Sequence, residues 1–207
     1  MNNYVAVDVD GTLVTSNISF LFGKYLYKRK MLSLFSALWM SSLYFLHQAG
    51  LISLKTLHKT IFSSLFKGKS LQLFEQEAEE LFSQATPFRP EVIKELKMRK
   101  EKGERIVLLS ASPDFLVRII AKILSVPEWY GTEYLVDAQG NFSDLGQIMT
   151  GEEKASVVKR ECQEHLVAIT DSKQDLPLVL LADEVLLVAP SYAFRRKVRH
   201  KGWKRLG

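Results

Sequence analysis

Two aspartates separated by one residue follow directly after an apolar run near the start of the chain. The run covers residues 4–7, and Asp8-Val-Asp10-Gly11 comes next. Such a run is typical of a buried strand, and side chains two positions apart on a strand share a face. Two carboxylates held so close need a cation, a shared proton or several hydrogen bonds. The pattern predicts either an acidic pair with a chemical role at the end of a buried strand or an ordinary Asp-Gly turn.

A second buried strand is expected over residues 105–109, and small polar residues follow it. We expect Ser112 to cap the next helix and Pro113 to be its first residue. Ser110 and the Ala111 amide would then lie at a junction between a strand and a helix. Backbone donors and the helix dipole favour an anion at such a place.

Two further segments add a lysine and two more carboxylates. Lys154 lies near the start of a helix expected over 152–164, and a strand over 165–170 ends at Asp171, four residues before Asp175. Each group alone has a simpler explanation, such as a surface lysine or a turn. Polar groups that recur in order at the carboxyl ends of strands are harder to explain in this way, because open parallel sheets bind ligands at that edge.

Together these segments resemble the four motifs of the haloacid dehalogenase-like phosphatase superfamily. The matching stretches are Asp8-Val-Asp10-Gly-Thr-Leu, Leu109-Ser110-Ala111-Ser112, Lys154 and Asp171-Ser-x-x-Asp175. The long insertion between the first two motifs is similar to that of the phosphoserine-phosphatase-like subclass, IB, which has a helical cap there. The resemblance spans essentially the whole chain, and it does not specify the substrate.

The resemblance implies a catalytic role for each matched residue. Asp8 would attack phosphorus and form an aspartyl-phosphate. Asp10 would protonate the leaving oxygen and then activate water, and Thr12 would help to orient Asp10. Four residues would contact the substrate or its phosphoryl group: Thr12, Ser110, Ala111 through its amide, and Lys154.

The resemblance also implies Mg²⁺ as the cofactor. Asp8, the backbone carbonyl of Asp10 and Asp171 would hold the ion, with waters and the phosphate completing its shell. Asp175 would be a further ligand or an anchor for the other ligands. Carboxylates for the metal and a lysine for the phosphate are the expected division of roles in phosphoryl transfer.

The order of predicted elements indicates an α/β fold. After residue 88, helices alternate with strands, at 90–102, 105–110, 113–124, 132–136, 152–164, 165–170, 176–182 and 184–188. Alternation of this kind implies a parallel sheet covered by helices. We therefore expect a Rossmann-like three-layer core with an inserted all-helical cap. Residues 1–14 and 88–207 would form the core, and 15–87 the cap.

The insertion over 15–87 is too long for a structureless connection. Its apolar residues recur at helical spacing, as at Phe20, Leu21, Tyr25 and Leu26; at Leu54, Leu57, Ile61 and Leu65; and at Leu71, Phe74, Ala78 and Leu81. This spacing predicts four helices folded over the catalytic edge as a lid.

Residues 31–46 carry no charge, and apolar residues continue to Leu54 with His47, Gln48 and Gly50 between them. A membrane-spanning helix needs about 20 apolar residues, so the uncharged stretch is short for one. The segment 31–54 therefore has four interpretations: a helix in the core of the cap, a dimer interface, a helix or hairpin that dips into one leaflet, or a full span.

The chain ends in a basic tail, residues 195–205, whose seven lysines and arginines exceed the net charge of +5. Such a cluster suits anionic lipid head groups, nucleic acid or a solvated terminal helix. Nucleic acid is the weakest of these partners because few aromatic residues interleave the charges. We expect peripheral contact with an anionic membrane through 31–54 and the basic tail.

A single cysteine, Cys162, excludes an intrachain disulfide, and the first strand begins too early for a cleavable signal peptide. We therefore expect a cytoplasmic protein, located at the inner face of a membrane if the apolar segment docks there.

The expected function is Mg²⁺-dependent hydrolysis of a phosphomonoester, and the apolar cap favours a lipid-like or amphiphilic substrate. The lipid-phosphate members of the subclass, such as phosphatidylglycerophosphate phosphatases, have a similar combination of features. Two alternatives remain at this point. One is a phosphatase for small soluble substrates such as phosphoserine, and the other is a non-catalytic phosphate-binding module with the same fold.

Overall fold

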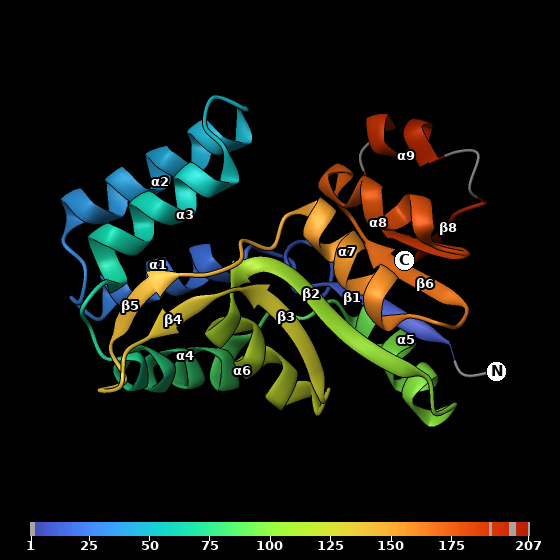
Figure 1. Cartoon of the computed structure of the whole chain (residues 1–207), viewed down its shortest axis with the longest axis horizontal. Helices are drawn as coiled ribbons and strands as arrows, with labels where there is room; N and C mark the ends of the chain where they lie inside the picture. Colours follow the sequence, from blue (N-terminus) through green and yellow to red (C-terminus); the bar gives the residue numbers. More distant parts are fainter. Residues whose placement is uncertain (1–2, 191, 199–201, 207) are drawn as a thin grey trace.

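The computed structural model describes residues 3–190, 192–198 and 202–206, and within them six strands form one parallel sheet (Figure 1). The strand order is β3-β2-β1-β6-β7-β8. The strands are β1 (Tyr4–Asp8), β2 (Arg105–Pro113), β3 (Glu128–Thr132), β6 (Leu166–Thr170), β7 (Glu184–Val188) and β8 (Lys204–Leu206). β1 lies between β2 and β6 in the middle of the sheet, which confirms the predicted α/β class.

Helices cover both faces of this sheet, and the central strands β1 and β6 accordingly consist almost entirely of apolar residues. The helices of the core are α5 (Pro90–Glu101), α6 (Asp114–Leu124), α7 (Gly151–Glu161), α8 (Leu176–Leu181) and α9 (Tyr192–Val198), with a 3₁₀ turn, η2 (Lys173–Asp175). Along β1, Val5 and Val7 pack into one hydrophobic cluster while Tyr4 and Ala6 pack into the other. The alternation gives the three-layer arrangement that the sequence predicts.

The structure corrects the prediction in two places around the second strand. β2 continues to Pro113, which is also the N-cap of α6, so Ser112 belongs to the strand and does not cap the helix. The single strand predicted over 132–136 is replaced by two strands. β3 joins the sheet, while β4 (Tyr134–Val136) pairs with β5 (Phe142–Leu145) in a separate hairpin.

The insertion folds into four α-helices, as its apolar spacing predicts. They are α1 (Ile18–Lys28), α2 (Leu34–Gln48), α3 (Leu54–Ile61) and α4 (Leu71–Ala85), and a π-helical turn, η1 (Phe62–Phe66), extends α3. The side chains of Asn17, Ser33 and Ser53 cap α1, α2 and α3, each accepting a hydrogen bond from a backbone N–H three positions on. These caps explain where the first three helices begin.

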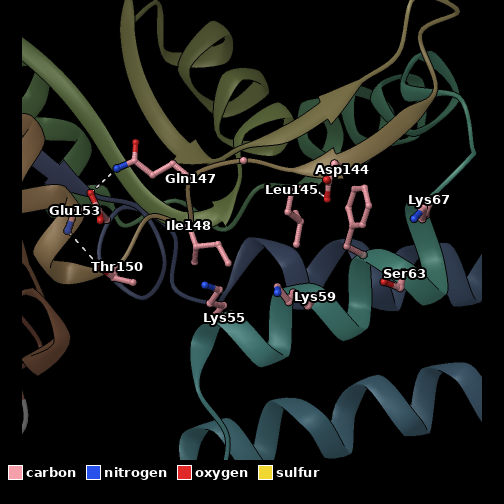
Figure 2. Close-up of a pocket in the computed structure, with 12 residues that line it drawn as sticks. Lys55, Lys59, Ser63, Lys67, Asp144, Leu145, Gln147, Ile148, Thr150 and Glu153 are labelled. Carbon is pink, nitrogen blue, oxygen red and sulfur yellow. Dashed lines mark hydrogen bonds between the residues drawn. The ribbon is translucent and has the colours of Figure 1, made fainter.

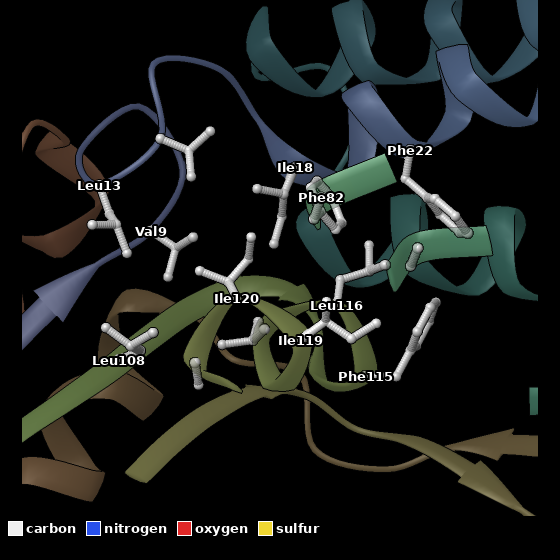
Figure 3. Close-up of a cluster of buried hydrophobic side chains, with 14 of the residues drawn as sticks. Val9, Leu13, Ile18, Phe22, Phe82, Leu108, Phe115, Leu116, Ile119 and Ile120 are labelled. Atoms are coloured by element: carbon white, nitrogen blue, oxygen red, sulfur yellow. The ribbon is translucent and has the colours of Figure 1, made fainter. Parts of the chain in front are cut away.

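One continuous hydrophobic cluster joins the insertion to the core, as Figure 3 shows for Ile18, Phe22 and Phe82 beside Phe115 and Leu116 of α6. The β4–β5 hairpin lies in the same cluster. Its Phe142 exchanges backbone hydrogen bonds with the turn after η1, donating to Lys69 and accepting from Gly68. We propose that the cap consists of residues 15–87 together with this hairpin.

The uncharged helix α2 lies at the outer edge of the cap (Figure 1), and most of its apolar side chains face outward. Phe35 is 80% exposed and Phe45 is 67% exposed, whereas Leu43 is buried. This exposure excludes the interpretation of 31–54 as a fully buried helix. Among the described residues, no helix has both the length and the apolar character needed to cross a membrane.

The basic tail is integrated into the fold over its described part. Phe194 and Val198 of α9 are buried in the second cluster, and β8 pairs in parallel with β7. Lys204 Nζ lies 3.6 Å from Glu184 Oε1. The described part of the tail is therefore not a solvated terminal helix. The expected membrane contact also includes Arg199 and Lys201, and these two residues lie outside the described residues.

Candidate functional site

The parallel register brings the polar strand ends to one edge of the sheet. Asp8 ends β1 and pairs with Leu109 of β2, so Ser110 comes immediately beyond this pair. On the other side, Val7 pairs with Ile169 of β6, which places Asp171 just past the same edge. Residues from widely separated positions therefore meet, as the order of motifs predicts.

Asp8 is buried at this edge, with a hydrogen-bonding partner on each carboxylate oxygen. Lys154 Nζ lies 2.6 Å from Asp8 Oδ1, and Thr12 Oγ1 donates to Asp8 Oδ2 at 2.8 Å. Burial raises the pKa of Asp8 well above its usual range, while the Lys154 charge opposes that shift and the neighbouring Asp175 adds to it. The ion pair with Lys154 therefore favours the charged form of Asp8 that a nucleophile requires.

Lys154 projects from the first turn of α7 and holds two carboxylates at once. Its Nζ lies 2.8 Å from Asp175 Oδ1, while Thr170 donates to Asp175 Oδ2 at 2.7 Å. Burial alone would lower the pKa of Lys154, but Asp175 and then Asp8 outweigh it, so the pKa is raised and the ammonium stays charged. These contacts fix Asp175 beside Lys154, and its role as a further ligand or as an anchor stays a prediction.

Asp10 is hydrogen-bonded to the end of β2 and to the start of α1. Its Oδ2 accepts from Ser110 Oγ at 2.6 Å and from Ser112 Oγ at 2.9 Å, and its Oδ1 accepts from the Ile18 N–H at 2.7 Å. Burial raises the pKa of Asp10, and the hydrogen bond from Ser110 is the strongest opposing influence. A raised pKa favours the protonated form that can act as an acid.

Sequence reasoning missed three of these contacts. Ser112 was assigned to a helix cap, yet it contacts Asp10 and its Oγ also lies 2.8 Å from Ser19 Oγ. The two-residue spacing of Ser110 and Ser112 on a strand could have revealed their shared face. The Ile18 N–H could not be predicted from the sequence, because every helix begins with free backbone N–H groups whatever its side chains are.

Thr12 has a different partner from the one expected. Among the described residues it makes no hydrogen bond to Asp10. Its hydroxyl contacts Asp8, lies 2.9 Å from Asp171 Oδ1 and accepts from the Asp171 N–H at 2.9 Å. Gly11 allows this close approach, since its φ is +81° and a Cβ there would lie 2.5 Å from Asp171 Oδ2.

The donor set around Thr12 fits a magnesium ion through Asp8 and Asp171. Both carboxylates contact one hydroxyl, and carboxylate oxygens are the ligands that Mg²⁺ prefers. Within the described part of the chain, no three side chains of His, Cys, Asp or Glu come together as a metal site. A backbone oxygen would therefore have to join the two carboxylates, as expected for the Asp10 carbonyl.

The remaining predicted residue, Ala111, lies in the extended end of β2. Its carbonyl accepts from Thr132 Oγ1 at 2.7 Å, and the role of its amide toward phosphate stays a prediction. Tyr44 of α2 reaches the same region from the cap. Burial raises the pKa of Tyr44, and the negative charges of Asp10 and Asp171 raise it further.

Comparison with known proteins shows the family and the fold. Residues 5–179 match the haloacid dehalogenase-like hydrolase family. The chain is 20% identical to a histidinol-phosphatase of Neisseria meningitidis serogroup C (strain 8013), with 98% of this chain and 97% of the other covered. Among solved structures, a Bordetella pertussis Tohama I protein of unknown function has a TM-score of 0.88 at 15% identity, covering 100% and 99% of the two chains. A substrate-bound phosphoserine phosphatase has a TM-score of 0.70 at 16% identity, covering 95% and 90%.

Proposed function

Because this chain belongs to the haloacid dehalogenase-like hydrolase family, we propose that it hydrolyses phosphomonoesters through a covalent intermediate on Asp8. The observation that carries the proposal is the pairing of Asp8 with Lys154 at the carboxyl end of the central strand. A buried carboxylate beside a fixed ammonium is suited to attack phosphorus while the positive charge offsets the phosphoryl oxygens.

The proposed reaction has two displacements. In the first, an Asp8 carboxylate oxygen bonds to phosphorus, the ester P–O bond breaks, and Asp10 gives its proton to the departing alkoxide. In the second, Asp10 takes a proton from water, the resulting oxygen bonds to phosphorus, and the bond to Asp8 breaks to release inorganic phosphate. The hydrogen bonds that Asp10 accepts from Ser110 and Ser112 hold it in place for both proton transfers.

We propose Mg²⁺ as the cofactor, held by Asp8, Asp171 and the Asp10 backbone carbonyl. When bound, the ion supplies positive charge that offsets the clustered carboxylates and the phosphoryl oxygens. Thr12 supports this arrangement because its hydroxyl contacts both proposed carboxylate ligands.

The exposed face of α2 favours an amphiphilic substrate. Large apolar side chains recur along this face and just after it, at Leu34, Phe35, Leu38, Trp39, Phe45, Leu46 and Leu51. Basic residues at 28–30 precede the helix. We propose that this face rests on an anionic membrane surface and brings the site to a lipid phosphate, which would place the protein at the inner face of a membrane. The basic tail would add to this contact.

A small soluble phosphomonoester is the second candidate substrate. The relatives named as histidinol-phosphatase and phosphoserine phosphatase support it, since both names describe phosphoric esters of polar amino compounds. The partly buried Tyr44 hydroxyl near Asp10 and Asp171 offers a polar contact that such a substrate needs.

Release of inorganic phosphate tests the proposal. The purified protein is assayed with lipid phosphomonoesters in mixed micelles, with phosphoserine and histidinol phosphate, and with 4-nitrophenyl phosphate, each with and without Mg²⁺. We expect Mg²⁺-dependent release, fastest with the lipid phosphates. Turnover of only the soluble esters would favour the second candidate, and binding of phosphate without any turnover would show a non-catalytic module.

A further inference from the structure

A groove of about 680 Å³ runs between α3 and the segment that links β5 to α7 (Figure 2). Lys55 and Lys59 project from α3 toward Ile148 on the opposite wall, and Lys67 lies further along the same side. Leu145 and Ile148, which are half-buried, contribute apolar surface to the groove. This volume is within the range of small-ligand sites in proteins.

The lysines of this groove are not paired with carboxylates in the described part of the chain. Among the described residues, Lys55, Lys59 and Lys67 form no ion pair. Two acids line the groove, and both already accept hydrogen bonds.

The carboxylate of Asp144 accepts from the Leu145 N–H at 2.8 Å, and that of Glu153 accepts from the Gln147 side-chain amide. The three lysines outnumber the two carboxylates in the lining, so the groove keeps a positive charge, and its unpaired ammonium groups can contact an incoming anion. Lysine is suited to phosphate because it acts as a point charge with several donors.

The same helix forms part of the groove and part of the catalytic site. Thr150 caps α7, and Thr150 and Glu153 both line the groove. The next residue along, Lys154, contacts Asp8. A ligand in the groove thus lies against the first turn of the helix that positions Lys154.

We propose that this lysine groove binds a second anionic group of the substrate, a phosphate or phosphodiester separate from the one that is hydrolysed. The proposal rests on the proposed function, since it assigns the substrate a phosphomonoester at Asp8 and another negative group at Lys55 and Lys59. The half-buried apolar side chains beside the lysines, Leu145 and Ile148, would contact the carbon chain between the two groups.

Kinetics of the double variant Lys55→Gln/Lys59→Gln test the groove. Three substrates are compared: 4-nitrophenyl phosphate, propane-1,3-diyl bisphosphate, and a lipid with a terminal phosphomonoester and an internal phosphodiester in mixed micelles. We expect the KM for a substrate with two anionic groups to rise about tenfold relative to that for 4-nitrophenyl phosphate. Lys97→Gln on α5, an exposed lysine outside the groove, is the matched control and should change neither KM.

The two substrates with a second anionic group distinguish the source of that group. A change with the bisphosphate assigns the groove to a soluble ligand, and a change with the lipid alone assigns it to a head group. An unchanged KM ratio for both overturns the proposal.

A binding experiment separates failure of the groove from failure of the proposed function. Propane-1,3-diyl bisphosphonate, which cannot be hydrolysed, is titrated into ¹⁵N-labelled protein, and amide shifts are followed by NMR. We expect shifts in 144–148 and 55–67 that disappear in Lys55→Gln/Lys59→Gln, whether or not the wild type turns over any ester. Shifts confined to the segments around Asp8 and Ser110, or shifts unchanged by the double variant, would refute the groove.

Discussion

Lys154 and Asp8 form a buried ion pair across a sequence separation of 146 residues, with Nζ 2.6 Å from Oδ1. Both side chains are 5% exposed. The same ammonium contacts Asp175, so two carboxylates share one positive charge. Removal of the ammonium would leave two buried carboxylates without a cation, whereas removal of one carboxylate leaves an ion pair in place.

Replacing the proposed nucleophile should abolish turnover and preserve the fold. Asp8→Asn keeps the size of the side chain and an oxygen that can accept from Thr12, while Lys154 keeps Asp175. We expect phosphate release to fall by at least about 10³-fold. Thermal unfolding followed by circular dichroism checks the fold, and Glu101→Gln on an exposed helix end is the control. Turnover at the wild-type rate would contradict the mechanism.

Removing the shared ammonium should destabilise the protein as well as inactivate it. Lys154→Met leaves the buried carboxylates of Asp8 and Asp175 without their cation. The free energy of unfolding in urea should fall by about 3–5 kcal/mol. Lys159→Met, at an exposed position on the same helix, should change it by less than about 0.5 kcal/mol. Equal effects of the two substitutions would show that the ion pairs do not stabilise the fold.

Asp114 should make stability fall as pH rises. Burial raises the pKa of its carboxyl from 3.8 to about 6, so the folded state holds a proton that the unfolded state loses first. The wild type should therefore lose up to about 3 kcal/mol of unfolding free energy relative to Asp114→Asn between about pH 4 and pH 7. Urea unfolding of both proteins across this range measures the difference. A constant difference would mean that Asp114 has an ordinary pKa.

His58 should have the opposite effect in an overlapping range. It is 7% exposed, and burial lowers its pKa from 6.5 to about 4. Its contribution to stability is present above its unfolded pKa and is lost as pH falls toward about 4. Relative to His58→Gln, the wild type should lose up to about 3 kcal/mol of unfolding free energy between about pH 7 and pH 4.

NMR titration of the His58 ring checks this directly. His58 Nδ1 lies 3.2 Å from the Tyr134 hydroxyl, so both residues should shift together when the ring is protonated. A ring that titrates near 6.5 would contradict the expected shift.

The outer face of α2 should control membrane binding. Phe35→Ser/Trp39→Ser removes two aromatic side chains that are 80% and 49% exposed. Burial of a large apolar side chain contributes about 1.5–3 kcal/mol, so co-sedimentation with anionic vesicles should weaken at least tenfold. Leu180→Ser, on a core helix where the leucine is 52% exposed, is the matched control.

Sedimentation velocity distinguishes the dimer interpretation. If the wild type sediments as a dimer and the α2 variant as a monomer, with no difference in vesicle binding, then α2 is an interface between two copies of the chain.

Much of this fold could be predicted from the sequence because its signals are local. Unbroken apolar runs mark β1 and β6, and Gly103 closes the predicted helix before β2. β3 is harder to predict, because Trp129 and Tyr130 are half-buried beside Glu128 and the strand lacks an apolar run. Its place in the sheet depends on pairing with β2, which is a contact distant in sequence.

The site could be predicted as a set of residues but not as a set of contacts. The motifs name Asp10, Ser110 and Thr12, whereas hydrogen-bond partners depend on side-chain direction at the end of each strand. In the structure, Asp10 accepts a hydrogen bond from Ser110, and the Thr12 hydroxyl contacts Asp8 and Asp171. The exposure of α2 could not be predicted either, because the apolar pattern of a helix is the same whether or not the rest of the protein covers its outer face.

The β4–β5 hairpin limits how this protein can be re-engineered. A chimera that exchanges only residues 15–87 would contain new helices but would keep a hairpin whose side chains pack against the original helices. Tyr134 and Phe142 pack against Phe66 with ring centroids 5.2 and 5.3 Å apart, and these contacts would be lost. Transplanting specificity from this chain to another scaffold therefore requires two discontinuous stretches of sequence to be moved together.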